Sequence, residues 1–136
     1  MPTKPLLLTI DDDPMIRQNI VSVANSAGFE CIEAGNPQEI SLALTKRPDI
    51  IVLDLTMPDM DGYEVLWELK RQHFNSGIIL SSGFFDQVVK GAEVYARKSG
   101  LNFMCRLDKP YSLSYLKKIL SETQNDFQNQ LEIHPC

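Results

Sequence analysis

Residues 50–54 read Ile-Ile-Val-Leu-Asp, and the turn-forming run Pro-Asp-Met-Asp-Gly follows at 58–62. A short apolar run bounded by turn signals is typical of a strand that is buried on both faces of a parallel sheet. Beyond the loop, Val65, Leu66 and Leu69 recur at helical spacing, which predicts a helix from about Tyr63 to His73. The stretch therefore predicts a buried strand that ends on an acid, then a polar loop and a helix.

The same alternation of apolar strand and helix runs through the rest of the chain. Further strands are predicted at Leu6–Ile10, Phe29–Ala34, Gly77–Ser81 and Leu101–Leu107. Further helices are predicted from Pro14 to Gly28, from Pro37 to Arg47, from Asp86 to Ser99 and after Ser112. Strict alternation with short connections favours right-handed crossovers and a parallel sheet. We therefore expect an α/β fold, a single doubly wound sheet of five parallel strands, (βα)5, with helices on both faces.

Several residues have predicted places at the ends or on the faces of these helices. Asp13 and Asn36 each precede a proline and are expected to be N-caps. Gly28 is expected to end the first helix in the left-handed conformation. Leu42 and Val88 are expected to face the core together with their apolar neighbours.

Length and composition indicate one compact domain. The chain has 136 residues, of which 43% are hydrophobic, and this is enough for a core of its own. We expect residues 1–121 to form the domain. The polar stretch 122–136 is expected to be a C-terminal tail, either the frayed end of the last helix or the stub of a linker.

Charge, hydropathy and cysteine content exclude several classes of protein. The net charge of -5 and the pI of about 4.9 argue against direct nucleic-acid binding. No apolar run approaches the roughly 18 residues of a membrane span. The first residues lack the pattern of a signal peptide, so we expect a cytoplasmic protein without membrane contact. Cys31, Cys105 and Cys136 are widely spaced and are interpreted as reduced thiols, the first two in the core.

Reactive side chains follow four of the predicted strands. They are Asp11, Asp12 and Asp13 after the first, Asp54 after the third, Ser81 and Ser82 after the fourth, and Lys109 after the fifth. In open parallel sheets, ligands bind beyond the carboxyl ends of the strands. These groups are therefore expected to converge on one small area.

Such an acid cluster indicates a cation and phosphoryl chemistry. Neighbouring carboxylates repel one another unless a cation lies among them, and all-oxygen ligation suits Mg2+ or Ca2+. We favour Mg2+ because it takes one or two protein carboxylates and leaves positions for phosphate oxygens. Asp54 is then the candidate nucleophile, and Lys109 and Ser82 can stabilise the charge on the transferred group.

Each of these residues also has a purely structural interpretation. Asp13 is better explained as a helix N-cap than as a metal ligand, and Asp12 alone could complement the helix dipole. Lys109 taken singly would be a solvated lysine, and Ser82 beside Gly83 would be turn chemistry. The joint placement of these groups at four strand ends favours the functional interpretation.

Four motifs resemble the receiver domain of two-component response regulators, over about residues 6–120. They are Leu-Thr-Ile-Asp-Asp-Asp-Pro at 8–14, Leu-Asp-Leu-Thr-Met-Pro-Asp-Met-Asp-Gly at 53–62, Leu-Ser-Ser-Gly at 80–83 and Asp-Lys-Pro-Tyr at 108–111. The resemblance implies a flavodoxin-like sheet with the strand order 2-1-3-4-5. It also implies a phosphoacceptor signalling domain, which catalyses only its own phosphorylation and dephosphorylation and is otherwise no enzyme.

The resemblance assigns roles to the residues at the strand ends. These are Asp54 as phosphoacceptor, Lys109 and Ser82 as catalytic groups, and Asp11, Asp12, Asp54 and the backbone carbonyl of Thr56 as ligands of Mg2+. The Lys109–Pro110 peptide bond is expected to be cis, as in the family. The implied phosphodonor is a sensor histidine kinase or a histidine phosphotransfer protein, and the implied target is a downstream effector protein or domain.

The expected output surface, and a surface for a homodimer, is the face of the fourth helix, fifth strand and fifth helix. The family often has an aromatic switch residue three positions before the lysine, where this chain has Arg106. Arg106 is expected either to pair with an acid, such as Glu93 or one on a partner, in one signalling state only, or to be a solvated strand-end residue. Phe84 and Phe85, close behind Ser82, are expected to change exposure on switching. The segment 100–110 is also similar to receivers that precede cyclic-di-GMP phosphodiesterase domains.

Three other functions fit less well. A flavodoxin-like flavin carrier needs a hydroxyl- and glycine-rich phosphate loop where this chain has three aspartates. A haloacid-dehalogenase-type phosphatase resembles a pattern with a second aspartate two residues after the nucleophile, and Thr56 stands there. A scaffold that works without phosphorylation would share the fold, but the acid cluster and the lysine argue against it.

Overall fold

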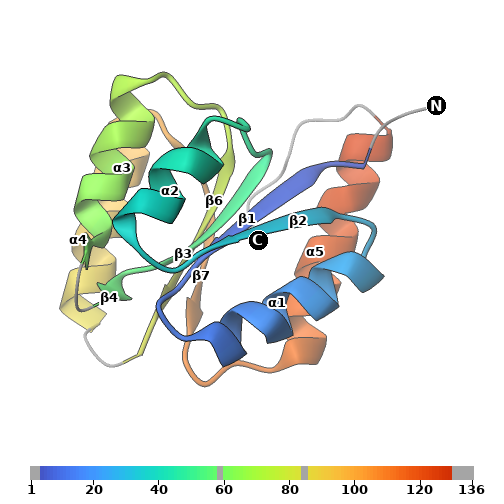
Figure 1. Ribbon diagram of the computed structural model, residues 1–136. Helices are drawn as coiled ribbons and strands as arrows, with labels where there is room; N and C mark the ends of the chain where they lie inside the picture. Colours follow the sequence, from blue (N-terminus) through green and yellow to red (C-terminus); the bar gives the residue numbers. More distant parts are fainter. Residues whose placement is uncertain (1–3, 58–59, 84–85, 130–136) are drawn as a thin grey trace.

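Five parallel strands form the central sheet of the protein (Figure 1). The computed structural model describes residues 4–57, 60–83 and 86–129. The strands of the sheet are β1 (Leu6–Ile10), β2 (Glu30–Ala34), β3 (Ile50–Asp54), β6 (Gly77–Ser82) and β7 (Asn102–Asp108). Their order is β2-β1-β3-β6-β7, with every neighbouring pair parallel. Counted along the chain this is the order 2-1-3-4-5, so the predicted fold class and topology are confirmed.

Helices cover both faces of this sheet, as expected (Figure 1). They are α1 (Pro14–Ser26), α2 (Pro37–Leu44), α3 (Gly62–Arg71), α4 (Asp86–Lys98) and α5 (Leu113–Gln128). α1 and α5 lie side by side on one face, and α2, α3 and α4 cover the other. The carboxyl ends of the five strands therefore share one edge, between the two layers of helices.

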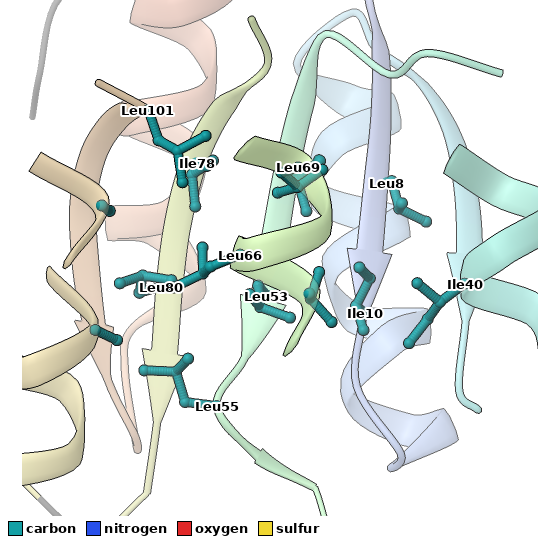
Figure 2. Close-up of a cluster of buried hydrophobic side chains, with 14 of the residues drawn as sticks. Leu8, Ile10, Ile40, Leu53, Leu55, Leu66, Leu69, Ile78, Leu80 and Leu101 are labelled. Atoms are coloured by element: carbon teal, nitrogen blue, oxygen red, sulfur yellow. The ribbon is translucent and has the colours of Figure 1, made fainter. Parts of the chain in front are cut away.

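The buried side chains form two clusters, one on each face of the sheet. Successive residues of a strand point to opposite faces. Ile51 and Leu53 of β3 therefore join the cluster under α2, α3 and α4, whereas Ile50 and Val52 join the cluster under α1 and α5. Figure 2 shows the first cluster, with Leu66 of α3 beside the strands. Burial on both faces explains why β3 is an unbroken apolar run.

The predicted capping residues are confirmed. Oδ1 of Asp13 accepts a hydrogen bond from the backbone N–H of Met15 at 2.9 Å, and Oδ1 of Asn36 accepts one from Glu39 at 2.9 Å. Gly28 has a φ of +96°, the left-handed conformation expected at the end of the first helix. These local bonds determine where α1 and α2 begin and where the chain leaves α1.

Two helical residues that were predicted to face the core are exposed instead. Leu42 of α2 is 69% exposed and Val88 of α4 is 39% exposed. The buried residues of α2, such as Ile40 and Ala43, recur at three- and four-residue spacing, and Leu42 falls between them. Val88 likewise precedes the buried Val89 by one position. Both predictions were wrong because an apolar residue next to a core position was assigned to the core stripe.

Two segments contain more regular structure than predicted. The loop after Asp54 holds a small antiparallel pair, β4 (Thr56–Met57) with β5 (Met60–Asp61). The segment 122–128, for which a frayed helix end was one of the expected alternatives, is the last part of α5. Thr123 is buried and Phe127 packs against the cluster under α1 and α5, so this part of the helix has an apolar side. The domain boundary at residue 121 stays a prediction.

Two further sequence expectations concern the membrane and the thiols. None of the helices in the described ranges has the length and apolar character needed to cross a membrane. Cys31 is half-buried and Cys105 is buried, and neither forms a disulfide within those ranges. Cys136 lies outside the described residues.

Candidate functional site

Three carboxylates meet where β1 and β3 end. Asp11 directly follows β1 and Asp54 is the last residue of β3, and the two strands are neighbours in the sheet. Carboxylate oxygens of Asp11, Asp12 and Asp54 all lie within 4.8 Å of one another. Asp11 and Asp54 are each 2% exposed, whereas Asp12 is exposed. The cluster could hold a metal ion, because a cation would relieve the repulsion among the three charges.

Lys109 reaches this cluster from the end of β7. Its Nζ lies 3.0 Å from Oδ2 of Asp11 and 3.5 Å from Oδ2 of Asp54. Its backbone N–H donates to the carbonyl oxygen of Ser82 at 2.8 Å, which ties Lys109 to the end of β6. The Lys109–Pro110 peptide bond is cis, as the family resemblance implied. One ammonium group thus lies beside two buried carboxylates.

Asp54 is held by the loop that follows it. The backbone N–H and the hydroxyl of Thr56 donate to Oδ1 of Asp54 at 3.0 and 3.1 Å. Burial raises the pKa of Asp54, and the charge of Asp11 raises it further. The hydrogen bonds from Thr56 and the charge of Lys109 lower that pKa, but the net shift is upward. The charge of Lys109 is therefore not enough to offset the cost of burying an ionised Asp54.

The same cluster raises the pKa of two neighbouring groups. Burial lowers the pKa of Lys109, but its hydrogen bond to Asp11 and the charge of Asp54 outweigh burial and raise it. Burial raises the pKa of Tyr111 to about 12, and the charges of Asp11 and Asp54 contribute. Lys109 therefore stays charged at neutral pH, and the Tyr111 hydroxyl stays protonated.

Three buried hydroxyls have no hydrogen-bond partner within the described part of the chain, namely those of Thr9, Ser81 and Ser82. Ser82 is 3% exposed at the end of β6, and Ser81 lies opposite Asp54 in the register of β3 and β6. An unpaired buried hydroxyl costs about 1–3 kcal/mol. Ser82, as the last residue of β6, is the one that the sequence motif singles out.

Asp13 stands apart from the acid cluster, as predicted. Its carboxylate caps α1, and its backbone N–H donates to Oδ1 of Asp11 at 3.0 Å. Thr56 contacts Asp54 through its N–H and hydroxyl, whereas a metal-binding role of its carbonyl oxygen stays a prediction. The structure thus brings Asp11, Asp12, Asp54 and Lys109 together.

Two residues near the cluster were not predicted from the sequence. Nη1 of Arg17 donates to the backbone carbonyl oxygen of Asp11 at 2.7 Å. The available signal was its position in the second turn of the helix, because long side chains on a helix point back toward its N-terminus. The second residue is Tyr111, whose pKa responds to the cluster.

A cavity of about 440 Å³ opens beside Lys109. Its lining comes from α1, from the residue after β6, from the segment between β7 and α5 and from the start of α5. It consists of Ile16, Asn19, Gly83, Lys109, Pro110, Tyr111 and Leu113. Much of this lining is apolar.

Arg106 lies at the position where many members of the family that the sequence resembles have an aromatic residue. Its Nη2 lies 3.3 Å from Oδ2 of Asp108, two residues further along β7. Glu93, the acid suggested from the sequence, pairs with Arg97 at 3.1 Å. Arg106 therefore pairs with an acid that was not foreseen. Phe84 and Phe85 lie outside the described residues, so their expected change in exposure stays a prediction.

Comparisons with known proteins agree on one family. The family model for the response regulator receiver domain matches residues 7–121. The phosphate regulon transcriptional regulatory protein PhoB of Pseudomonas aeruginosa is 31% identical over 126 residues, which cover 86% of this chain and 52% of PhoB. The transcriptional regulatory protein PdtaR of Mycobacterium tuberculosis is 29% identical over 112 residues, which cover 81% of this chain and 52% of PdtaR. The chain thus spans about half the length of these relatives.

Solved structures lead to the same family. A response regulator from Colwellia psychrerythraea has a TM-score of 0.78 and 29% identity, over 90% of this chain and 98% of that one. The chemotaxis protein CheY4 of Vibrio cholerae has a TM-score of 0.74 and 25% identity, over 88% of this chain and 98% of that one. With the acid cluster and the lysine at the strand ends, these matches show that the chain belongs to the response regulator receiver domain family of two-component signalling.

Proposed function

We propose that this receiver domain accepts a phosphoryl group on Asp54 in a Mg2+-dependent reaction and switches conformation in response. One observation carries the proposal. The buried carboxylate of Asp54 lies within 4.8 Å of those of Asp11 and Asp12 and 3.5 Å from the ammonium of Lys109. The donor is a sensor histidine kinase or a histidine phosphotransfer protein, and the target is a downstream effector protein or domain.

The acid cluster fits Mg2+. Asp11, Asp12 and Asp54 supply carboxylate oxygens, and the backbone carbonyl of Thr56 supplies a further oxygen. The raised pKa of Asp54 supports this assignment, because burial and the charge of Asp11 disfavour the ionised carboxylate and a cation would favour it. A bound ion would offset the charge on the phosphoryl oxygens.

Phosphoryl transfer exchanges one bond to phosphorus for another. A carboxylate oxygen of Asp54 attacks the phosphorus of a phosphohistidine, the O–P bond forms and the N–P bond breaks. The imidazole nitrogen leaves with the electron pair and takes up a proton. Lys109 and the Ser82 hydroxyl donate to the phosphoryl oxygens. Later attack of water on phosphorus releases phosphate and restores Asp54.

The conformational response begins at Ser82. Its hydroxyl is unpartnered in the described chain, and its carbonyl oxygen binds the backbone N–H of Lys109. Movement of Ser82 toward the phosphoryl group therefore acts on the ends of both β6 and β7. The output surface is the face of α4, β7 and α5, where Arg97 of α4 lies over the ring of Phe103 in β7. The same face is the proposed surface for a homodimer or an effector.

Intact-mass measurement after incubation with phosphoramidate, an N–P phosphodonor, tests the proposal. The protein should gain one phosphoryl group in Mg2+ and none in EDTA. Asp54→Asn, checked for folding by circular dichroism, should gain none in either condition. Labelling of Asp54→Asn, or of the wild-type protein in EDTA, would show that the nucleophile or the metal dependence is wrongly assigned.

A further inference from the structure

The side chain of Arg17 connects three segments around the acid cluster. From α1, its Nη1 donates to the carbonyl oxygen of Asp11 at 2.7 Å. Its Nε donates to Oε1 of Glu33, in β2, at 3.1 Å. The Arg17 side chain is only 17% exposed. The guanidinium is therefore fixed at both ends and screened from solvent, unlike an ordinary surface ion pair.

The carbonyl that Arg17 binds belongs to the peptide group between Asp11 and Asp12. The other polar atoms of Asp11 are also engaged. Its N–H donates to Ala34 at 3.2 Å, Oδ1 accepts from Asp13 at 3.0 Å, and Oδ2 accepts from Lys109 at 3.0 Å. The orientation of this peptide group determines how the two neighbouring carboxylates are directed relative to each other.

Gly35 provides the space in which the guanidinium lies. A Cβ atom at Gly35 would lie 2.4 Å from Nη1 of Arg17 and 3.4 Å from the carbonyl oxygen of Asp11. The backbone N–H of Gly35 donates to Oε1 of Glu39 at 2.8 Å, which holds the loop in place. A methyl group at this position would therefore displace the end of the Arg17 side chain, which is the more flexible of the two.

We propose that Arg17 is a positioning residue for the cation, which holds the peptide group between Asp11 and Asp12 in the orientation that directs both carboxylates to the metal. This inference rests on the proposed function, because it assumes that the cluster binds Mg2+. It adds a residue outside the strand-end motifs and gives Gly35 a role in the same site.

Removal of the Arg17 side chain would change Mg2+ affinity in opposite directions, depending on whether its positioning role or its charge dominates. A guanidinium close to the cluster repels a second cation, so if its charge alone mattered, its removal would tighten Mg2+ binding. If Arg17 holds the Asp11–Asp12 peptide group, its removal weakens Mg2+ binding. Residues that orient metal ligands typically change affinity by about 10- to 100-fold. The sign of the change therefore separates the two effects.

Isothermal titration of the metal-free protein with Mg2+, without a phosphodonor, tests the inference. Arg17→Met should weaken Mg2+ binding roughly tenfold, at the low end of the range for such residues. Arg97→Met, which removes the same charge from a distant exposed pair on α4, should leave the affinity unchanged. Unchanged or tighter binding by Arg17→Met, or an equal loss in Arg97→Met, would overturn the inference.

Gly35→Ala is the sharper variant, because it keeps the charge of Arg17 and moves only its guanidinium. It should also weaken Mg2+ binding and shift the amide resonance of Asp12 in the metal-free protein. Combined with Arg17→Met it should cause little further loss, because both changes break the same hydrogen bond. It also keeps the test decisive if Arg17→Met folds poorly, and full affinity in Gly35→Ala would overturn the inference. Phosphoryl labelling at saturating Mg2+ is measured separately, so that loss of the proposed function is distinguished from loss of positioning.

Discussion

Nζ of Lys109 lies 3.5 Å from Oδ2 of Asp54, and yet the pKa of Asp54 is raised above its ordinary value. Burial outweighs the ion pair, in part because the same ammonium lies closer to Asp11, at 3.0 Å. Without a metal ion, the ionised site therefore has too little positive charge. This imbalance has a measurable consequence for the stability of the domain.

The metal-free domain should lose stability as the pH rises above the ordinary pKa of Asp54, 3.8, toward the raised pKa of the folded state. In this window the folded protein holds a proton that the unfolded chain has released, and stability falls wherever the folded state binds more protons. Asp54→Asn removes the effect. Its melting temperature in EDTA should therefore exceed that of the wild-type protein by a margin that grows with pH. Lys109 contributes only above its own ordinary pKa of 10.5, outside this window.

Thermal melts in EDTA at several pH values check this expectation. Asp108→Asn is the matched control, because its side chain is 65% exposed and lies outside the acid cluster. At the upper end of the window, the margin of Asp54→Asn over the wild-type protein should exceed the margin of this control. A margin for Asp54→Asn that is no larger would mean that burial of Asp54 does not limit the stability of the metal-free state.

The three consecutive aspartates should differ in their effect on metal binding. Asp11→Asn and Asp12→Asn each remove a carboxylate from the cluster and should weaken Mg2+ binding strongly. Asp13→Asn should bind Mg2+ as the wild type does, because asparagine caps a helix as well as aspartate and the Asp13 side chain caps α1. Calorimetric titration without phosphodonor measures all three. A loss in Asp13→Asn equal to that in Asp12→Asn would contradict the assignment of the cluster.

Those parts of the fold that depend on local chemistry were predictable from the sequence. β1 has the predicted bounds because its apolar run meets an acid and a helix cap directly behind it. The convergence of Asp11, Asp54 and Lys109 was also predictable, because parallel strands bring their carboxyl ends to one edge. For these residues, position in the sequence determines position in the fold.

Contacts that depend on how far a side chain reaches were not predictable in the same way. Arg17 bonds the carbonyl of Asp11, a contact that was not predicted from the sequence, and Arg106 pairs with Asp108, whereas the sequence suggested Glu93. The exposure of Leu42 depends on the rotational phase of α2, a helix of only eight residues. Such details follow from tertiary packing, and a pattern of apolar residues does not determine them.

The effect of an alanine at Gly91 of α4 should depend on the residue at position 63 of α3. A Cβ atom at Gly91 would lie 2.3 Å from the Tyr63 hydroxyl, which bonds the carbonyl oxygen of Val88 at 3.4 Å. Alanine is favoured over glycine inside a helix by about 1 kcal/mol. Gly91→Ala should therefore stabilise the Tyr63→Phe protein, which lacks the hydroxyl, more than the wild-type protein. Urea unfolding of the four proteins checks this, and equal gains in both backgrounds would show that the contact between α3 and α4 is not tight.

Ser82→Ala should weaken the conformational response to phosphorylation without destabilising the metal-free domain. The Ser82 hydroxyl is buried and has no partner in the described chain, so its removal should leave the metal-free domain as stable as before or stabilise it by about 1 kcal/mol. With Mg2+ and beryllofluoride, a mimic of the phosphoryl group, the wild-type protein should show amide shifts near Asp54 and also along β7 up to Lys109. In Ser82→Ala the shifts near Asp54 should remain, and those in β7 should shrink.

Ser81→Ala is the matched control for this experiment. Its hydroxyl is equally buried and unpartnered within the described residues, but its carbonyl oxygen accepts from the backbone N–H of Leu55 at 2.9 Å, whereas that of Ser82 accepts from Lys109 at the end of β7. Ser81→Ala should therefore keep the shifts in β7 that Ser82→Ala loses. If both variants keep the full wild-type pattern, or if the wild-type shifts stay confined to residues around Asp54, the response does not pass through Ser82 to the face of α4, β7 and α5.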